Sequence, residues 1–223
     1  NSNATEIAQR RQLDNFKNRM FMVDTSKRLV KVARTAMILN GDGYTGMTQG
    51  DSLGPYESFA EKIVSMCHKN IPSIILTNPP FAGVGEGKQS DGPTLERFEL
   101  GKKWSYIDGE YQKTHELCAD GVPPEMLFVE RCVDWLRPGG KLGIVLPKGF
   151  LDTNTYQSAR ALLLRKCRIL AIINMHKNTF QPYTGVRTCL ILVQKLQESE
   201  EITTIEDYSI FMAISNKIGQ DSE

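Results

Sequence analysis

Apolar residues along this chain gather in short runs of strand length that alternate with longer segments of helical spacing. The short runs cover residues 20–23, 44–49, 71–77, 141–146, 168–175 and 188–195. The longer segments, in which apolar residues recur three and four positions apart as on one helix face, cover residues 29–37, 56–68, 123–135 and 156–165. This alternation predicts an α/β fold with a mainly parallel sheet.

The two ends and one internal stretch depart from this pattern. Residues 1–4 resemble a cloning remnant rather than part of the fold, and residues 5–19 have the spacing of a weakly amphipathic helix. Since a helix then precedes the first strand, we expect another strand and its loop upstream. Residues 82–115 are rich in glycine and have no clean period, so they are predicted to form a long loop or lid. No repeat or linker divides residues 5–223, which predicts a single domain.

The composition excludes several classes of protein. With 223 residues, 40% of them hydrophobic, and a net charge of +1, the chain is expected to fold rather than remain disordered. No apolar run approaches the roughly 18–20 residues of a membrane helix, and no secretory signal is evident, so we expect a cytoplasmic protein without a membrane partner. Five scattered cysteines without a CxxC pair and three dispersed histidines predict reduced thiols and no metal site.

Charge is distributed unevenly along the chain. Residues 1–40 contain eight basic and three acidic side chains, whereas residues 197–223 form an acidic C-terminal segment with seven acidic side chains and one lysine. A basic region can attract phosphate groups. Such charges are also ordinary on the solvent face of helices. Both interpretations of the basic region stay open, and charge alone permits nucleic acid without indicating it.

Polar side chains follow three of the predicted strands, at the edge of the sheet where ligands of open α/β folds bind. Asp24 and Asp51 follow the first two strands, and the turn Asn78-Pro79-Pro80-Phe81 follows the third. An acid at the end of an early strand can accept two hydrogen bonds from ribose hydroxyls. Asp is also a common residue in front of a helix, where it caps free N–H groups. Both roles are open for the two acids.

The turn at residues 78–81 is the most specific feature of the sequence. Its two prolines fix the backbone φ angle and remove two N–H donors, and Pro79 holds Asn78 in an extended conformation. Backbone carbonyls and the Asn78 amide oxygen are then presented rigidly beside the ring of Phe81. This arrangement suits a planar aromatic amine, because it offers two acceptors for two N–H groups and a ring for stacking. A sharp turn without a ligand is the alternative.

The turn and its context resemble a known family. Residues 78–81 match the [DNS]-P-P-[FYW] motif of amino-methyltransferases that use S-adenosylmethionine, and their NPPF form resembles DNA adenine-N6 methyltransferases. The methylation (M) subunit of type I restriction-modification systems is similar in the segments around the motif, at residues 21–24, 37–43, 50–53, 136–147 and 180–188. The resemblance runs from about residue 20 to 215. It implies a Rossmann-like S-adenosylmethionine-dependent methyltransferase fold.

The resemblance also implies roles for the residues of the turn. Asn78 and the carbonyl of Pro79 would accept the amino protons of the target adenine, with Pro80 completing the rigid motif. Phe81 would stack on the base after it is flipped out of the duplex. Phe180, in a late loop, is a weaker candidate for clamping the base from its other side.

The same resemblance assigns the cofactor to the acids. Asp24 would bind the ribose hydroxyls of S-adenosylmethionine, and Asp51, with Leu53 nearby, would contact its adenine. The glycine-rich loop that the family places after its first strand is absent, and the nearest glycines lie at residues 41–43, after a helix. We therefore expect a partial methyltransferase domain, truncated at both ends, without its first strand and inactive by itself.

The implied function is methylation of the N6 amino group of adenine in double-stranded DNA. The expected partners are the specificity (S) subunit, which would read the sequence, and the restriction (R) subunit. RNA or a protein glutamine amide, also planar amines, are alternative substrates, although Phe rather than Tyr at position 81 favours adenine in nucleic acid. A third interpretation, which the missing glycine loop favours, is a non-catalytic module that binds DNA or a partner.

Overall fold

The computed structural model divides the chain into two compact units, residues 1–65 and residues 66–223. The described residues are 19–40, 46–61, 63–64, 72–82, 87–197 and 207–218. The predicted helix over residues 5–19 lies outside them except for residue 19, and so do residues 62 and 65–68 of the predicted helix over residues 56–68. The interpretation of the chain as a single domain stays a prediction.

The first unit contains a short βαβ arrangement. Strand β1 (Met22–Asp24) pairs in parallel with β2 (Met47–Gln49), and α2 (Lys27–Leu39) lies between them in sequence. The helix begins after Ser26, whose hydroxyl accepts the N–H of Leu29, and ends at Asn40. Arg34 on this helix donates two hydrogen bonds, of 3.1 and 2.7 Å, to the Met47 carbonyl. These elements confirm two predicted strands and the predicted helix, with ends shifted by a few residues.

The predicted helix over residues 56–68 begins differently. Residues Tyr56–Ser58 form one 3-10 turn, η1, and Phe59 returns to an extended backbone. The Phe59 side chain is buried within the fold, at 7% exposure. Burial of this ring outweighs the weak local preference for a continuous helix, since propensity is readily overridden by packing.

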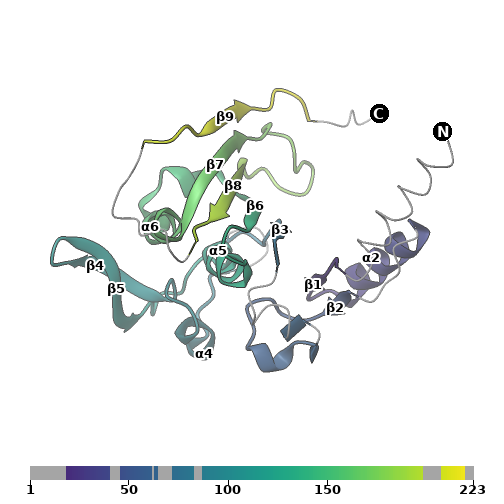
Figure 1. Ribbon diagram of the computed structural model, residues 1–223, viewed down its shortest axis with the longest axis horizontal. Coiled ribbons are helices and arrows are strands. Elements are labelled where there is room, and N and C mark those ends of the chain that lie inside the picture. The colour runs from purple at the N-terminus through teal and green to yellow at the C-terminus, as the bar shows by residue number, and fades with distance from the viewer. Residues whose placement is uncertain are drawn as a thin grey trace. The chain divides into compact units, whose positions relative to one another are not determined.

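The second unit is built on a five-stranded sheet with the order β3-β6-β8-β7-β9 (Figure 1). The strands are β3 (Ile74–Thr77), β6 (Lys141–Pro147), β7 (Cys167–Asn174), β8 (Thr188–Lys195) and β9 (Phe211–Ile214). The β3–β6 and β7–β9 pairs are parallel, whereas β8 runs antiparallel to both β6 and β7. Four strands therefore share one direction. The exception is β8. It follows β7 through a loop without a crossover helix, and this loop reverses the direction of the chain.

Helices α5 (Pro124–Trp135) and α6 (Gln157–Lys166) pack on this sheet. Two short turns, η2 (Lys148–Leu151) and η3 (Asn154–Tyr156), connect β6 to α6. The core residues of the sheet and α5 include Leu127, Val129, Ile144 and Val193, none of which has measurable exposure. Predicted strands and helices in this part of the chain are thus confirmed. Within the described residues, no helix is long and apolar enough to cross a membrane.

The prediction of a long loop over residues 82–115 is wrong for much of that stretch. It contains α4 (Gly92–Glu96) and an antiparallel hairpin of β4 (Lys102–Ile107) and β5 (Glu110–Leu117). The hairpin closes through Asp108 and Gly109, both with positive φ, of 54° and 86°. An Asp-Gly pair between aromatic, strand-forming runs is a strong hairpin signal. The glycine content of residues 82–115 nevertheless led to the prediction of a loop. Figure 1 shows the hairpin extending away from the sheet.

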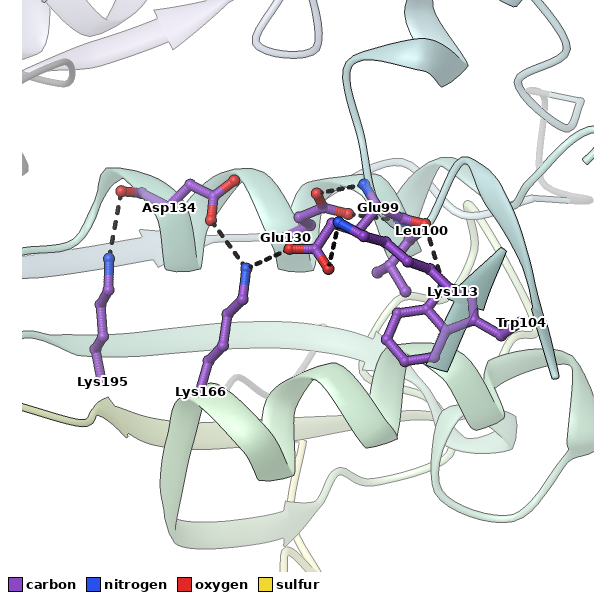
Figure 2. A network of polar contacts seen from close by, with 8 residues as sticks. All are labelled: Glu99, Leu100, Trp104, Lys113, Glu130, Asp134, Lys166 and Lys195. Carbon is purple, nitrogen blue, oxygen red and sulfur yellow. Dashed lines mark hydrogen bonds and ion pairs between the residues drawn. The ribbon is translucent and has the colours of Figure 1, made fainter. Parts of the chain in front are cut away.

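A polar network joins α5 and α6 to the hairpin (Figure 2). The side chain of Glu130, 2% exposed, accepts the backbone N–H groups of Glu99 and Leu100 at 2.7 and 2.8 Å. The Glu99 carboxylate in turn pairs with Lys166 at 3.0 Å and Lys113 at 3.2 Å. Burial raises the pKa of Glu130 to about 7, against the opposing effect of the two backbone donors.

This raised pKa predicts a pH-dependent stability. A carboxyl whose pKa is higher in the folded state stabilises the fold below its unfolded pKa, and that contribution disappears as the pH rises through 7. As the pH rises from 5 to 8, Glu130 loses its proton, and we expect the free energy of unfolding to fall by roughly 2–3 kcal/mol. Urea unfolding of wild type and Glu130→Gln at both pH values measures this, because the variant lacks the titrating group. Parallel pH profiles for the two proteins would contradict the assignment.

Candidate functional site

The turn at residues 78–81 follows β3 directly, at the carboxyl end of the strand. The last residue of β3, Thr77, pairs in register with Ile144 of β6, which anchors the start of the turn to the sheet. Asn78 is exposed, whereas Pro79 is buried and Phe81 is buried with 7% of its surface accessible. The amide of Asn78 is thus available to a ligand, while the ring of Phe81 is packed within the fold in this conformation.

A buried carboxylate on α5 holds the residue that follows the turn. Glu125, with no exposed surface, accepts the backbone N–H of Ala82 through Oε2 at 3.0 Å. Its Oε1 accepts the hydroxyl of Tyr156, at 2.6 Å. Sequence reasoning missed both side chains. An acidic residue in the first turn of a helix is favourable there in any protein, so Glu125 gave no signal of a special role.

Two further loops lie on the same edge of the sheet. Strands β3, β6 and β7 run in one direction, so η2 after β6 and residues 175–187 after β7 leave the sheet where the Asn78 turn does. The N–H of Lys148 donates to the Arg187 carbonyl at 2.8 Å and ties these two loops together. Phe180 lies in the second loop and is half-buried. At about 4.8 Å per strand, the ends of β3 and β7 are roughly 14 Å apart.

In the first unit, Asp24 and Asp51 lie at the carboxyl end of the β1–β2 pair. The Gly50 N–H donates to the Asp24 carbonyl at 3.1 Å, which places the segment containing Asp51 beside the end of β1. Asp24 Oδ1 accepts the N–H of Ser26 at 2.7 Å, and its Oδ2 has no hydrogen-bond partner among the described residues. Ser26, and not Asp24, caps α2. The capping alternative for Asp24 is therefore excluded.

Asp51 has a similar local arrangement. Its Oδ1 accepts the N–H of Leu53 at 2.9 Å, and its carbonyl accepts the N–H of Gly54 at 2.9 Å. The Asp51 side chain is exposed, whereas Leu53 is buried at 7% exposure. These two hydrogen bonds fold residues 51–54 into a tight turn. The structure brings Asp24 and the Asp51–Leu53 turn together at one end of two adjacent strands.

These features define a class of protein. The strands and helices alternate, acids follow two adjacent parallel strands, an Asn-Pro-Pro-Phe turn follows β3, and one antiparallel strand lies in the five-stranded sheet. The chain has the Rossmann-like fold of S-adenosylmethionine-dependent methyltransferases, as its structural similarity to such enzymes shows. The chain belongs to the N-6 DNA Methylase family, whose model matches residues 3–221. The resemblance found in the sequence motifs is confirmed.

Individual relatives agree with this family. The chain is 30% identical over 130 residues to the type I restriction enzyme EcoEI methylase subunit of Escherichia coli, covering 58% of this chain and 22% of the relative. It is 24% identical over 177 residues to the type II restriction enzyme and methyltransferase RM.BcgI of Heyndrickxia coagulans, covering 78% of this chain and 22% of the relative. The chain spans about a fifth of the length of these curated relatives.

A solved structure supports the fold. The type I restriction-modification system methyltransferase subunit from Streptococcus thermophilus superposes with a TM-score of 0.56 at 21% identity. The superposition covers 80% of this chain and 34% of that chain. The superposition shows that the two chains share a fold.

Proposed function

We propose that this chain transfers a methyl group from S-adenosylmethionine to the N6 amino group of adenine in DNA. The observation that carries the proposal is the exposed Asn78 amide, presented by two prolines at the carboxyl end of β3 in a member of the N-6 DNA Methylase family. The amide oxygen and the Pro79 carbonyl are acceptors for the two N–H groups of an aromatic amine. A site for a phosphate or a carboxylate would instead be built mainly from N–H donors, and the two prolines that follow Asn78 supply none.

The chemistry follows from the electronic structure of the amine. The lone pair of adenine N6 is delocalised into the ring, which makes the amine a poor nucleophile. Two acceptors that hold its protons favour a more pyramidal nitrogen with its lone pair directed outward. When bound, the cofactor supplies an electrophilic methyl group on a sulfonium. In the transfer, N6 would displace the sulfur, which would keep the electron pair of its bond to the methyl carbon, and N6 would lose one proton to water. The residues of this chain contribute positioning and electrostatics.

The acids of the first unit suit the nucleoside part of that cofactor. Asp24 has an oxygen that accepts no hydrogen bond from the described residues, and ribose hydroxyls are donors that such an oxygen binds. The exposed Asp51 lies in the turn that also holds the buried, apolar Leu53. An exposed acceptor beside an apolar side chain suits the amino edge and the face of an adenine ring.

We further propose that the chain works with separate subunits on double-stranded DNA. A specificity (S) subunit would read the sequence and a restriction (R) subunit would cleave it. The E. coli relative is a type I restriction enzyme methylase subunit, and the name of that protein supports this organisation. Co-purification with the products of neighbouring genes tests the proposal; a protein that methylates DNA without them would contradict it.

The proposed substrate can be tested directly. The complete gene product, with any subunits encoded beside it, is incubated with labelled S-adenosylmethionine and double-stranded DNA of mixed sequence, RNA, or a glutamine-containing protein. Nucleoside digestion followed by mass spectrometry is expected to find N6-methyladenine in the DNA alone. Label in the RNA or on a glutamine amide would identify the alternative substrates. The absence of label in all three would support a non-catalytic module.

Phe81 provides a further prediction, on base binding. A ring that stacks on the flipped adenine contributes about 1–3 kcal/mol. Since Phe81 is buried, truncation to Ala would also leave a cavity, and Phe81→Leu is the better test because it keeps most of the volume. We expect Phe81→Leu to weaken capture of a 2-aminopurine placed at the target position by this amount, and Phe81→Tyr to retain it. Equal capture by the Leu variant and wild type would exclude stacking by this ring.

A further inference from the structure

We propose that Glu125 is a positioning residue, which holds the Asn78–Phe81 turn in the geometry that receives the target amine. The inference rests on the proposed function. Its starting point is the hydrogen bond from the Ala82 N–H to Glu125 Oε2, which joins the residue after the turn to helix α5. The two positions are 43 residues apart in the chain.

The burial of Glu125 requires an explanation. The side chain has no exposed surface, and burying a carboxylate is costly unless its oxygens are hydrogen-bonded. Both oxygens have a partner here: Oε2 accepts from Ala82, and Oε1 accepts from Tyr156. Neither partner lies in α5. The carboxylate therefore links three parts of the second unit, rather than stabilising the helix that carries it.

The two prolines of the turn explain why a hydrogen bond at Ala82 is needed to fix it. Pro79 and Pro80 have no N–H and cannot be held through backbone donors. The next residues along the chain must therefore contribute to fixing the end of the turn. A hydrogen bond at Ala82 does so directly behind Phe81, while the pairing of β3 with β6 fixes the start of the turn. Asn78 and the Pro79 carbonyl lie between these two anchors.

Tyr156 holds the carboxylate itself. Burial raises the pKa of Tyr156, and the hydrogen bond to Glu125 raises it further, so the phenol keeps its proton and acts as the donor. The ring of Tyr156 packs at 5.4 Å from that of Phe150 in η2, measured between ring centres. The contact sequence Phe150–Tyr156–Glu125–Ala82 connects the loop after β6 to the turn after β3. Two loops on one edge of the sheet are thus fixed relative to each other.

Positioning of this kind predicts a particular kinetic signature. Transfer depends on the alignment of the amine within about 0.5 Å, so a displaced turn lowers kcat. The cofactor candidates Asp24 and Asp51 belong to the first unit, and the KM for S-adenosylmethionine should remain unchanged. General destabilisation would instead lower the melting temperature without such a selective loss of kcat.

The variants are chosen to separate hydrogen bonding from volume. Glu125→Gln preserves the contacts, because its carbonyl can accept from Ala82 while its NH₂ donates to the phenol oxygen of Tyr156. Glu125→Met has a similar size and neither contact. Tyr156→Phe removes one hydroxyl and serves if the Met variant does not fold. Leu162→Ala, at a fully buried position of α6, controls for loss of stability alone.

Two measurements test whether Glu125 positions the Asn78–Phe81 turn, and both use the complete gene product with any subunits encoded beside it. Hydrogen exchange of the Ala82 amide is expected to be at least 10-fold faster in Glu125→Met than in wild type, and within 3-fold of wild type in Glu125→Gln. In methyl transfer, kcat is expected to fall 10- to 100-fold in Glu125→Met, with an intermediate loss in Tyr156→Phe. The Gln variant and Leu162→Ala should stay within 3-fold of wild type, and KM for the cofactor within 2-fold throughout.

Three outcomes would overturn the inference: unchanged exchange at Ala82 in the Met variant, unchanged kcat despite faster exchange, or an equal loss of kcat in the Gln and Met variants. A wild-type protein that methylates no adenine would refute the proposed function, and with it the catalytic part of the inference. The exchange of Ala82 would still decide whether Glu125 holds the turn.

Discussion

Replacement of Asn78 by Ala is expected to lower the rate of methyl transfer to adenine by a factor of about 10²–10³, the usual loss for one preorganised polar contact to the reacting group. Affinity for S-adenosylmethionine should change little. The reason is local: the exposed amide of Asn78 makes no hydrogen bond to the described part of the fold, so its loss removes an acceptor for the amine and leaves the structure intact. Single-turnover transfer and calorimetric cofactor binding measure the two quantities separately.

Matched variants make this expectation specific. Asn78→Asp and Asn78→Ser retain an acceptor, and both residues occur in the motif that the turn resembles, so they should keep part of the activity. Asn216→Ala, at another exposed asparagine of the second unit, should behave as wild type. Loss of cofactor binding in parallel with loss of transfer would show that Asn78 has a structural or cofactor role instead.

Asp24→Ala is expected to weaken binding of S-adenosylmethionine by about 10- to 150-fold. Hydrogen bonds to a charged group contribute about 1.5–3 kcal/mol, and a tenfold change in affinity corresponds to about 1.4 kcal/mol. Helix α2 should be unaffected, since Ser26 is its N-cap. Isothermal calorimetry on the complete gene product gives the dissociation constant. Unchanged affinity would refute the assignment of this carboxylate to the ribose.

The local contact of Asp24 calls for its own control. Because Asp24 Oδ1 accepts the N–H of Ser26, the Ala variant also loses one bond inside the protein. Asp24→Asn keeps that acceptor and removes the second one, so it should weaken cofactor binding while leaving thermal stability close to wild type. Glu61→Ala, at an exposed carboxylate of the same unit, should alter neither quantity. Restoration of full affinity in Asp24→Asn would assign the effect of the Ala variant to the turn at Ser26.

Much of the fold could be predicted because most of its strands and helices are determined by residues that are close together in the sequence. The β-branched residues of β3 and β8 favour strands. The apolar spacing of α2, α5 and α6 favours helices, and both patterns can be recognised within a short stretch of sequence. The Asn-Pro-Pro-Phe turn is of the same kind, since prolines restrict their own backbone and that of the preceding residue. The hairpin of β4 and β5 was also local, with its Asp108-Gly109 signal, and the prediction missed it by giving more weight to the surrounding glycines.

Other features depend on contacts between distant parts of the chain. The apolar run of β8 is compatible with either direction in the sheet, and its pairing with β7 and β6 is what shows it to be antiparallel. The exposure of Asn78 and the burial of Phe81 follow from how the turn packs, which the motif does not contain.

What the sequence determined by itself is the alternation of strands and helices, the rigid turn after β3 and the acids after β1 and β2, because each depends on residues close together in the chain. The tertiary structure alone decided that Glu125 is buried and that it meets Ala82 and Tyr156, which lie 43 and 31 positions away. The physical reason is that a carboxylate on a helix has no intrinsic preference for the interior. Its place there depends on donors that only the folded chain brings to it.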